Sequence, residues 1–167
     1  MNLNYYFINT ILGKLTVIEK NNVVVYIGLP EYSFESIQNW CNNQFGVSKF
    51  QFIENTKTKL KFQLEEYFEK KRTHFDLNYE LFTTNFRTKV LNEVSKIPFG
   101  QTKSYSEIAE KIKNPKAVRA VGSANATNTL PIIIPCHRVI SRNGGLGGYG
   151  GGLDMKIKLL ELEGWNN

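Results

Sequence analysis

Apolar and polar positions alternate along the first part of the chain. Residues 5–29 gather β-branched and aromatic residues on either side of Asn21-Asn22, as in Leu15-Thr16-Val17-Ile18 and Val23-Val24-Val25-Tyr26-Ile27. This pattern is typical of antiparallel strands joined by a tight turn. It predicts a hairpin, or part of a small antiparallel sheet.

Two segments with helical spacing follow, at residues 33–45 and 57–71. The apolar stripe of the second consists of Leu60, Leu64, Tyr67 and Phe68. His74-Phe75-Asp76-Leu77 predicts a return strand. No pattern in residues 1–83 points to chemistry, so this half is interpreted as a support domain of sheet and helix.

The second half, residues 84–167, has a different pattern. Apolar residues recur at helical spacing over its first segment, at Phe86, Val90, Leu91, Val94 and Ile97. Pro98-Phe99-Gly100 ends this predicted helix. Ser104-Tyr105-Ser106-Glu107 fits a capping box, which opens a short helix as far as about Ile112.

A third helix is predicted from Lys116 to about Asn125, with Asn114-Pro115 as its N-cap and N1 proline. Two short helices joined by a tight polar turn are what a helix-turn-helix requires. Many helical hairpins bind nothing, so the pattern carries little weight alone. Here the helix begins with Lys116 and Arg119, which favours DNA as the partner.

Charge is divided unevenly between the halves. The formal net charge is +6. Residues 1–83 carry nine basic and nine acidic residues, whereas residues 84–167 carry twelve basic and six acidic ones. The whole excess therefore lies in the second half, which suggests a polyanionic partner there. A solvated basic face is the alternative interpretation.

The segment around Cys136 has no regular period. Leu130-Pro131-Ile132-Ile133-Ile134-Pro135 precedes it, and two prolines preclude a regular helix. Cys136 is therefore expected on, or just after, a constrained extended segment. A glycine-rich loop at residues 143–152 follows, and then a final helix from Asp154 to Glu163, which Gly164 ends.

Cys136 itself has two interpretations. A lone cysteine is most often a small buried hydrophobe. Against this, His137 is adjacent, Arg138 follows, and prolines and glycines on both sides impose an unusual backbone. A neighbouring base or cation makes a thiol nucleophilic by raising its thiolate fraction. Adjacent residues of an extended segment point to opposite sides, so contact between Cys136 and His137 needs a turn or a bridging water.

Composition excludes several classes of function. Cys41 and Cys136 are too few for a disulfide scaffold, and with only His74 and His137 beside them a four-ligand zinc site is not expected. No apolar run can cross a bilayer, and the N-terminus lacks a secretory signal. A cytoplasmic protein is expected, with the nucleoid of a prokaryote or the nucleus of a eukaryote as its place of action. The glycine-rich loop matches no phosphate-binding motif. It is either a flexible linker or a surface that a flat base can approach closely.

Together, residues 86–164 closely resemble the O6-alkylguanine-DNA alkyltransferases. The matching segments are Ile97-Pro98-Phe99-Gly100, Ser104-Tyr105, Arg119-Ala120-Val121-Gly122, Asn128, Pro131-Ile132-Ile133-Ile134-Pro135-Cys136-His137-Arg138-Val139-Ile140, Gly148-Tyr149, Gly151-Gly152-Leu153, Leu159-Leu160 and Glu163-Gly164. Residues 1–83 resemble the variable N-terminal domain of that family only in size and coarse pattern.

The resemblance implies an α+β fold and a reaction. A small α/β domain with an antiparallel sheet, similar to ribonuclease H, would precede a mostly helical domain with a winged-helix-like helix-turn-helix. The implied reaction is direct reversal of DNA damage. One alkyl group moves irreversibly from O6-alkylguanine, or from O4-alkylthymine, to Cys136 after the nucleotide flips out of the duplex. The implied partner is double-stranded DNA containing O6-alkylguanine, and the implied enzyme is a monomer that needs no cofactor, metal or membrane.

The resemblance also implies catalytic roles. Cys136 is the alkyl acceptor, His137 relays its proton through a water, and Glu163 orients the imidazole. Asn128 holds the turn that carries Cys136. Tyr105 acts near the phosphate of the flipped nucleotide and donates a proton to the departing guanine.

Two further groups are implied, one for DNA and one for the base. The DNA-binding residues are Arg119, which would fill the gap in the duplex, and Tyr105, Lys116, Ala120, Ser123 and Arg138. The base pocket consists of Pro131, Val139, Tyr149, Gly150 and Gly151, with backbone groups at Cys136, Val139 and Gly150 reading the flipped base.

Two positions depart from the family pattern. Thr129 follows Asn128 where relatives often have proline, which makes the turn less rigid, and Gly150 replaces a common hydroxyl residue, so only its amide can donate to O6. A non-catalytic alkyltransferase-like recognition protein is the main rival function, but such proteins typically carry tryptophan in place of Cys136. A helix-turn-helix regulator leaves Cys136 and Glu163 without a purpose, and a thiol–metal or redox role lacks partner residues.

Overall fold

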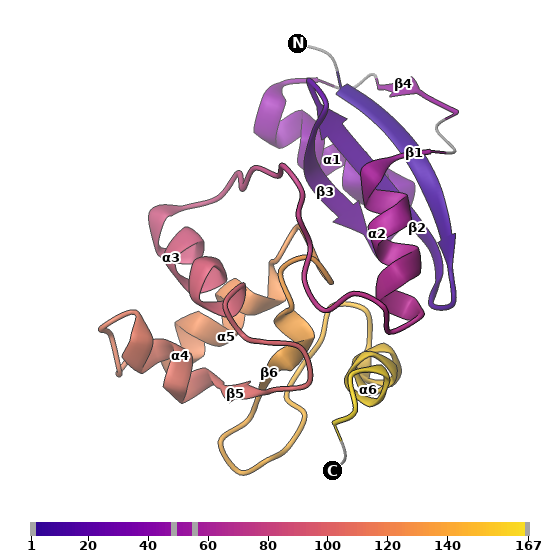
Figure 1. Cartoon of the computed structure of the whole chain (residues 1–167). Coiled ribbons are helices and arrows are strands. Elements are labelled where there is room, and N and C mark those ends of the chain that lie inside the picture. The colour runs from indigo at the N-terminus through magenta and orange to yellow at the C-terminus, as the bar shows by residue number, and fades with distance from the viewer. Residues whose placement is uncertain (1–2, 48–49, 55–56, 166–167) are drawn as a thin grey trace. The chain divides into compact units, whose positions relative to one another are not determined.

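The alternating segment forms three consecutive antiparallel strands, β1 (Leu3–Thr10), β2 (Gly13–Lys20) and β3 (Val23–Gly28) (Figure 1). The computed structural model describes residues 3–47, 50–54 and 57–165. A short strand, β4 (Gln51–Phe52), pairs in parallel with β1, so the sheet order is β3-β2-β1-β4. Asn21 and Asn22 have φ angles of 51° and 66°, and a two-residue hairpin turn with two left-handed residues needs such values. The predicted hairpin is confirmed.

Both helices predicted in this half form. α1 (Phe34–Phe45) follows the N-cap Ser33, whose side chain accepts a hydrogen bond from Ser36. α2 (Lys59–Phe68) follows Thr58, which caps it in the same way. Within the predicted stripe of α2, three residues are buried and the fourth is partly exposed, in the order Leu60, Leu64, Tyr67 and Phe68. A core of six buried residues joins the strands to α1: Leu3, Ile18, Val25, Tyr26, Ile37 and Cys41.

The predicted return strand at His74–Leu77 is wrong. Gln63, which is 2% exposed, donates to the Asp76 carbonyl at 2.9 Å and accepts from the Asp76 amide at 2.8 Å. This side chain therefore takes the backbone groups that a strand would offer to its neighbour. Pairing with the sheet comes slightly later, where Tyr79 forms an isolated bridge with Val24 of β3.

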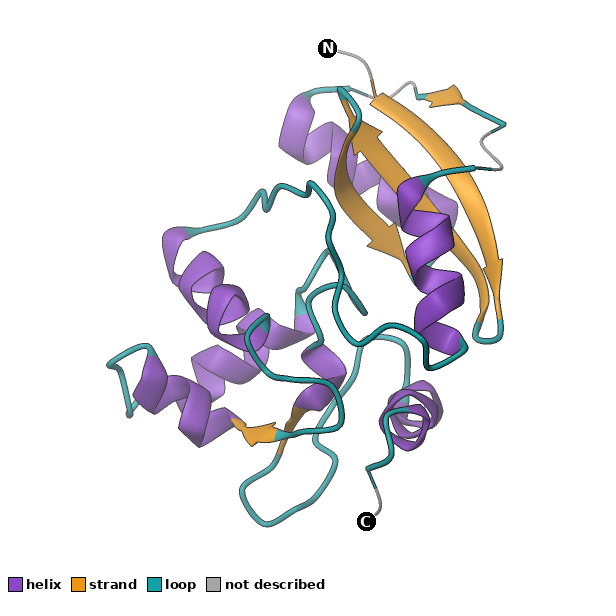
Figure 2. Cartoon of the chain, viewed as in Figure 1, coloured by secondary structure: helices purple, strands orange, loops and turns teal. Residues whose placement is uncertain are grey.

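The chain divides into two compact units, Met1–Phe82 and Thr83–Asn167. The second unit is mostly helical (Figure 2). Its elements are α3 (Asn85–Val94), β5 (Lys103–Ser104), α4 (Tyr105–Lys111), α5 (Val118–Ala126), the 3-10 turn η1 (Cys136–Arg138), β6 (Val139–Ile140) and α6 (Leu153–Leu162). β5 and β6 pair in parallel. The α+β class is as predicted. No helix in the described residues is long and apolar enough to cross a membrane.

The capping box of α4 is confirmed. The Ser104 hydroxyl accepts from the Glu107 amide at 3.2 Å, and the Glu107 carboxylate accepts from the Ser104 amide at 2.7 Å. The final helix also forms, and Gly164 with a φ of 82° follows its end.

The predicted N-cap of α5 is wrong. Lys113 has a left-handed φ of 59°, its amide donates to Glu110, and the next amide, that of Asn114, donates to Ala109. This pair of bonds is a Schellman motif, so Asn114 ends α4 and does not open α5. α5 begins at Val118 after Ala117, which makes no side-chain cap.

Candidate active site around Cys136

Cys136 begins a single 3-10 turn directly after a buried, irregular loop. Ile132 in this loop has a φ of 73°, a strained value for a β-branched residue. The Ile134 amide donates to Leu130, and the Cys136 amide donates to Ile134 at 2.8 Å. The predicted extended segment is therefore a tight turn, although Cys136 does follow it. Cys136 and His137 occupy consecutive positions of this 3-10 turn.

Asn128 fixes this loop, as expected from the sequence. It is 7% exposed, donates to the Ile134 carbonyl at 2.8 Å and accepts from the Leu130 amide at 3.0 Å. The same side chain hydrogen-bonds the Cys136 thiol. Thr129 in place of proline therefore does not leave the turn without support.

The Cys136 thiol is 5% exposed. Burial raises the pKa of this thiol, while hydrogen bonds from Asn128 and Tyr149 and the charge of Lys156 oppose that rise. The group is thus a protonated thiol at neutral pH, with polar partners that favour the thiolate once the proton leaves. It therefore needs a base.

His137 and Glu163 form a fully buried pair, with His137 Nε2 at 2.8 Å from Glu163 Oε1. Burial lowers the pKa of His137 more than Glu163 raises it, so the imidazole is neutral at pH 7. Burial would raise the pKa of Glu163, but hydrogen bonds from His137 and Arg138 lower it to about 2. An ionised carboxylate only accepts, so Nε2 carries the imidazole proton. Nδ1 of His137 keeps its lone pair, and it has no hydrogen-bond partner among the described residues.

Arg138 does not fit the DNA-contacting role predicted for it. Its guanidinium is buried and binds both oxygens of Glu163 at 2.8 Å. It also donates to the Ile97 carbonyl at 2.6 Å. These donors are used inside the unit, so Arg138 stabilises the carboxylate that holds His137.

Lys156 is a site residue that the sequence analysis missed. Its side chain is fully buried, and Nζ donates to the carbonyls of Val139 at 2.6 Å, Leu146 and Gly148 at 3.2 Å. It thereby ties β6 to the glycine-rich loop. Burial lowers the pKa of Lys156 to about 8, and the nearby Cys136 raises it. A lysine within the buried face of α6, next to Met155, was a signal that could have revealed it.

Tyr105 lies against the glycine-rich loop. Gly147 has a φ of 68°, and a Cβ there would stand 2.6 Å from the Tyr105 hydroxyl. On the other side, a Cβ at Gly122 of α5 would meet the Tyr105 ring at 3.8 Å. Burial and the nearby Cys136 raise the pKa of Tyr105, while a hydrogen bond from the Gly148 backbone lowers it. These glycines therefore let a phenol approach both the loop and the thiol.

The predicted pocket residues differ in exposure. Pro131, Val139 and Gly151 are buried, Tyr149 is partly buried, and Gly150 is exposed. The Tyr149 side chain is near enough to Cys136 to lower the pKa of its thiol.

The other predicted DNA-binding residues are exposed around α5. Arg119, Ala120 and Ser123 are exposed within the helix, and Lys116 is exposed just before it. Their spacing of three or four residues puts them on one face. The opposite face is buried through Val121, Ala124 and Asn125.

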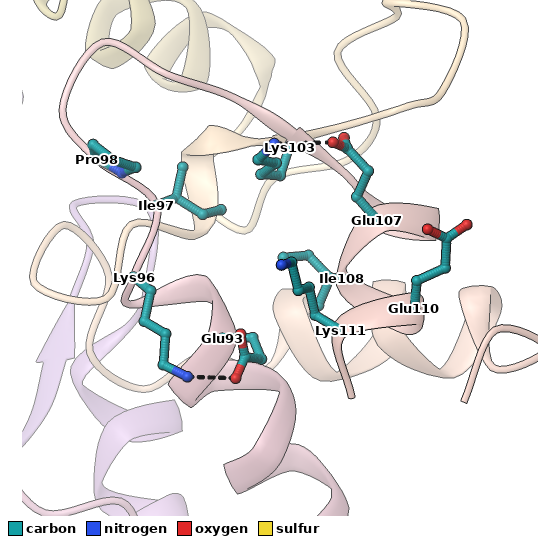
Figure 3. Close-up of a pocket in the computed structure, with 9 residues that line it drawn as sticks. All are labelled: Glu93, Lys96, Ile97, Pro98, Lys103, Glu107, Ile108, Glu110 and Lys111. Atoms are coloured by element: carbon teal, nitrogen blue, oxygen red, sulfur yellow. Dashed lines mark hydrogen bonds and ion pairs between the residues drawn. The ribbon is translucent and has the colours of Figure 1, made fainter. Parts of the chain in front are cut away.

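A separate cleft of about 580 Å³ lies between α3, β5 and α4 (Figure 3). Ion pairs join Glu93 to Lys96 at 2.5 Å and Lys103 to Glu107 at 3.0 Å on its walls. None of its lining residues belongs to the predicted site. Among the described residues, no group of three or more histidine, cysteine or acidic side chains could hold a metal ion.

Known proteins are similar to this chain in sequence and in fold. Residues 85–165 match the sequence model of the 6-O-methylguanine DNA methyltransferase DNA-binding domain. The inducible methylated-DNA–protein-cysteine methyltransferase of Bacillus subtilis (strain 168) is 38% identical over 160 residues, which cover 96% of this chain and 84% of that protein.

Two crystal structures extend the likeness. Mycobacterium tuberculosis OGT in complex with DNA has a TM-score of 0.84 and 37% identity, covering 96% of this chain and 92% of that one. The O6-methylguanine-DNA methyltransferase of the hyperthermophilic archaeon Pyrococcus kodakaraensis shares the fold, with a TM-score of 0.74 at 22% identity and coverage of 98% and 99%. Since a relative of this identity matches nearly the whole chain, the chain belongs to the methylated-DNA–protein-cysteine methyltransferase family.

Proposed function

We propose that this protein repairs double-stranded DNA by moving the alkyl group of O6-alkylguanine to its own Cys136. The observation that carries the proposal is a buried thiol beside a neutral His137. Asn128 and Tyr149 oppose the rise in the pKa of this thiol, and His137 Nδ1 has no hydrogen-bond partner among the described residues. Such a thiol has both a base to remove its proton and partners to hold the resulting thiolate.

The transfer is a displacement at the alkyl carbon. His137 Nδ1 takes the thiol proton through a water, and the Cys136 sulfur attacks the carbon bound to O6. The carbon–oxygen bond breaks, its electron pair goes to the guanine oxygen, and the Tyr105 hydroxyl donates a proton to the departing base. The product is a thioether, which water does not cleave, so each molecule reacts once.

The target carbon is inaccessible inside a stacked duplex, so the nucleotide must flip out, at a cost of about a few kcal/mol. Arg119, exposed on α5, offsets part of this cost by filling the gap in the duplex. Tyr105 acts near the phosphate of the flipped nucleotide. Backbone groups around Cys136, Val139 and Gly150 read the flipped base, and the amide of Gly150 can donate to O6. Pro131 and Tyr149 line the pocket.

The rival function is recognition of damaged guanine without repair. Cys136 disfavours it, because recognition alone gives no reason to surround a thiol with Asn128, Tyr149 and Lys156. Incubation with a duplex containing O6-methylguanine should add the mass of one methyl group to the Cys136 peptide, and only once. The adduct should appear in proportion to the O6-methylguanine lost. Complete repair of the DNA with an unmodified Cys136 would exclude the proposal.

A further inference from the structure

A tight turn after α3, at residues 97–100, reaches the buried carboxylate of Glu163. The Gly100 amide donates to Glu163 Oε2 at 3.2 Å. The Ile97 carbonyl, at the start of the same turn, accepts from Arg138, which itself binds both oxygens of Glu163. One segment of backbone therefore contacts both members of the buried ion pair.

Position 100 in this turn requires a residue without a side chain. The Gln101 amide donates to the Pro98 carbonyl at 3.1 Å, and Gly100 has a φ of 74°. The turn is thus of type II, which needs a left-handed residue at its third position. Space is a second restriction, because a Cβ at Gly100 would stand 2.9 Å from the backbone oxygen of Glu163. The missing side chain therefore lets the Gly100 amide approach the end of α6.

The Gly100 amide completes the set of donors around one carboxylate. Oε1 of Glu163 accepts from His137 Nε2 and Arg138 Nη2, both at 2.8 Å. Oε2 accepts from Arg138 Nε at 2.8 Å and from the Gly100 amide. Four hydrogen bonds fill the acceptor sites of an ionised carboxylate and fix its plane. His137 depends on that plane, because the bond from Nε2 to Oε1 decides which ring nitrogen carries the proton.

We propose that Gly100 is a positioning residue for alkyl transfer, whose amide holds the Glu163 carboxylate in the orientation that keeps the His137 proton on Nε2 and leaves Nδ1 as the base. This inference rests on the proposed function. Without the Gly100 amide, Glu163 keeps its bond to Arg138 but can turn away from His137. The imidazole proton then moves to Nδ1 in a fraction of the molecules, and those molecules cannot accept the thiol proton.

The test uses the full chain labelled with nitrogen-15 histidine, because the sequence contains only His74 and His137. The chemical shifts of the ring nitrogens show which nitrogen carries the proton, and the exposed His74 is the internal reference. Gly100→Ala adds a side chain that forces the turn away from Glu163. In this variant the His137 signals should move from those of the Nε2–H form toward those of a mixture of tautomers, while the His74 signals stay unchanged.

Methyl transfer is measured on the same variant in single turnovers with O6-methylguanine DNA. The rate constant at saturating DNA should fall about tenfold, the equivalent of one hydrogen bond to a charged group. The DNA concentration that gives the half-maximal rate should not change. Gly46→Ala is the matched control, because Gly46 has a similar φ of 66° but a Cβ there would meet no heavy atom of the described residues within 4 Å. It should leave the rate constant and the His137 signals unchanged.

Slower transfer with unchanged His137 signals would show that Gly100 is only structural and would overturn the inference, as would an unchanged rate constant. If Gly100→Ala does not fold, hydrogen exchange in the unmodified protein decides. Gly100 is exposed, yet its amide should exchange slowly because Glu163 accepts its hydrogen, and unprotected exchange would overturn the inference. The exchange and the histidine signals are measured without DNA. Failure of the proposed function is recognised separately, by the absence of transfer from O6-methylguanine to the unmodified protein.

Discussion

Cys41 and Cys136 are both free thiols inside the fold, at 0% and 5% exposure. Cys41 belongs to the apolar core of the first unit, and burial raises its pKa to about 12 with no opposing contribution. Burial raises the pKa of Cys136 as well, but Asn128, Lys156 and Tyr149 oppose the rise. The desolvation cost is common to the two sites. The difference lies in polar groups from the loop before Cys136, the glycine-rich loop and α6, so those groups, and not the cysteine, mark the reactive site.

The largest expected effect comes from replacing each of the two cysteines in a separate variant. Cys136→Ser should abolish methyl transfer, because a serine hydroxyl is far less acidic and nucleophilic than a thiol. Cys41→Ala should leave the transfer rate unchanged after correction for folded protein. Mass spectrometry of both proteins after incubation with O6-methylguanine DNA measures this. Methylation of Cys41, or transfer by Cys136→Ser, would contradict the conclusion that the polar groups around Cys136 mark the reactive site.

Glu163→Gln should cost about 3–5 kcal/mol of stability at pH 7, because it leaves the buried Arg138 without its counter-ion. The pKa of Glu163 is lowered from 4.5 to about 2, so its stabilisation is present above pH 4.5 and is lost as the pH falls toward 2. Urea unfolding at several pH values should show this loss in the unmodified protein and not in the variant.

Glu93→Gln is the matched control, because Glu93 pairs with the exposed Lys96. It should cost less than about 1 kcal/mol. Equal losses for the two glutamate variants would contradict the role given to the buried network.

Lys156→Met should lower the reactivity of Cys136 about tenfold near neutral pH, because removing a nearby positive charge raises the pKa of the thiol further. The pH profile of iodoacetamide alkylation, followed at the Cys136 peptide, measures this pKa. Lys158→Met, on the exposed side of the same helix, should leave the profile in place.

The same lysine also makes the stability of the protein depend on pH. Its pKa falls from 10.5 to about 8 on folding, so between these values the unfolded chain binds more protons. The stability of the unmodified protein relative to Lys156→Met should therefore rise from pH 8 to 10.5. A fall over that range would show that the buried ammonium is favoured by its three carbonyl acceptors more than burial disfavours it.

Tyr105→Phe tests the phenol hydroxyl. The variant loses the hydrogen bond to the departing guanine, and transfer should slow about tenfold, as for the loss of one such bond. The ring still fits between Gly122 and Gly147, so thermal unfolding should be little changed. Single-turnover kinetics on saturating DNA measures the rate, and an unchanged rate constant would remove Tyr105 from the mechanism.

Turns and helix caps could be predicted from the sequence where the residues that form them are neighbours in the chain. The Asn21-Asn22 turn needs two residues that tolerate left-handed φ, and the Ser104–Glu107 box closes within one helical turn. The non-local bonds could not be predicted. The Gln63 side chain takes the place of a strand partner at Asp76. The left-handed conformation of Lys113 makes Asn114 the end of α4, whereas the sequence predicted it as the start of α5.

The candidate site divides in the same way. Cys136, His137, Glu163 and Asn128 could be identified because the motif contains them. Asn125 and Lys156 act on backbone carbonyls up to 17 residues away, and nothing in their side-chain type indicates such a partner. Arg138 was assigned to DNA because its charge is visible in the sequence while its burial against Glu163 is not.

The Gln63–Asp76 contact has a consequence for the edge of the sheet. β3 is an edge strand in the order β3-β2-β1-β4, and uncovered edges promote strand exchange and aggregation. The chain from Asp76 onward covers part of this edge, where Val24 exchanges backbone hydrogen bonds with Asn78 and Glu80 at 3.3 and 3.1 Å. Gln63 holds that covering segment without making it a strand. One glutamine side chain thus helps to hold the segment that covers the backbone groups of Val24 on this edge.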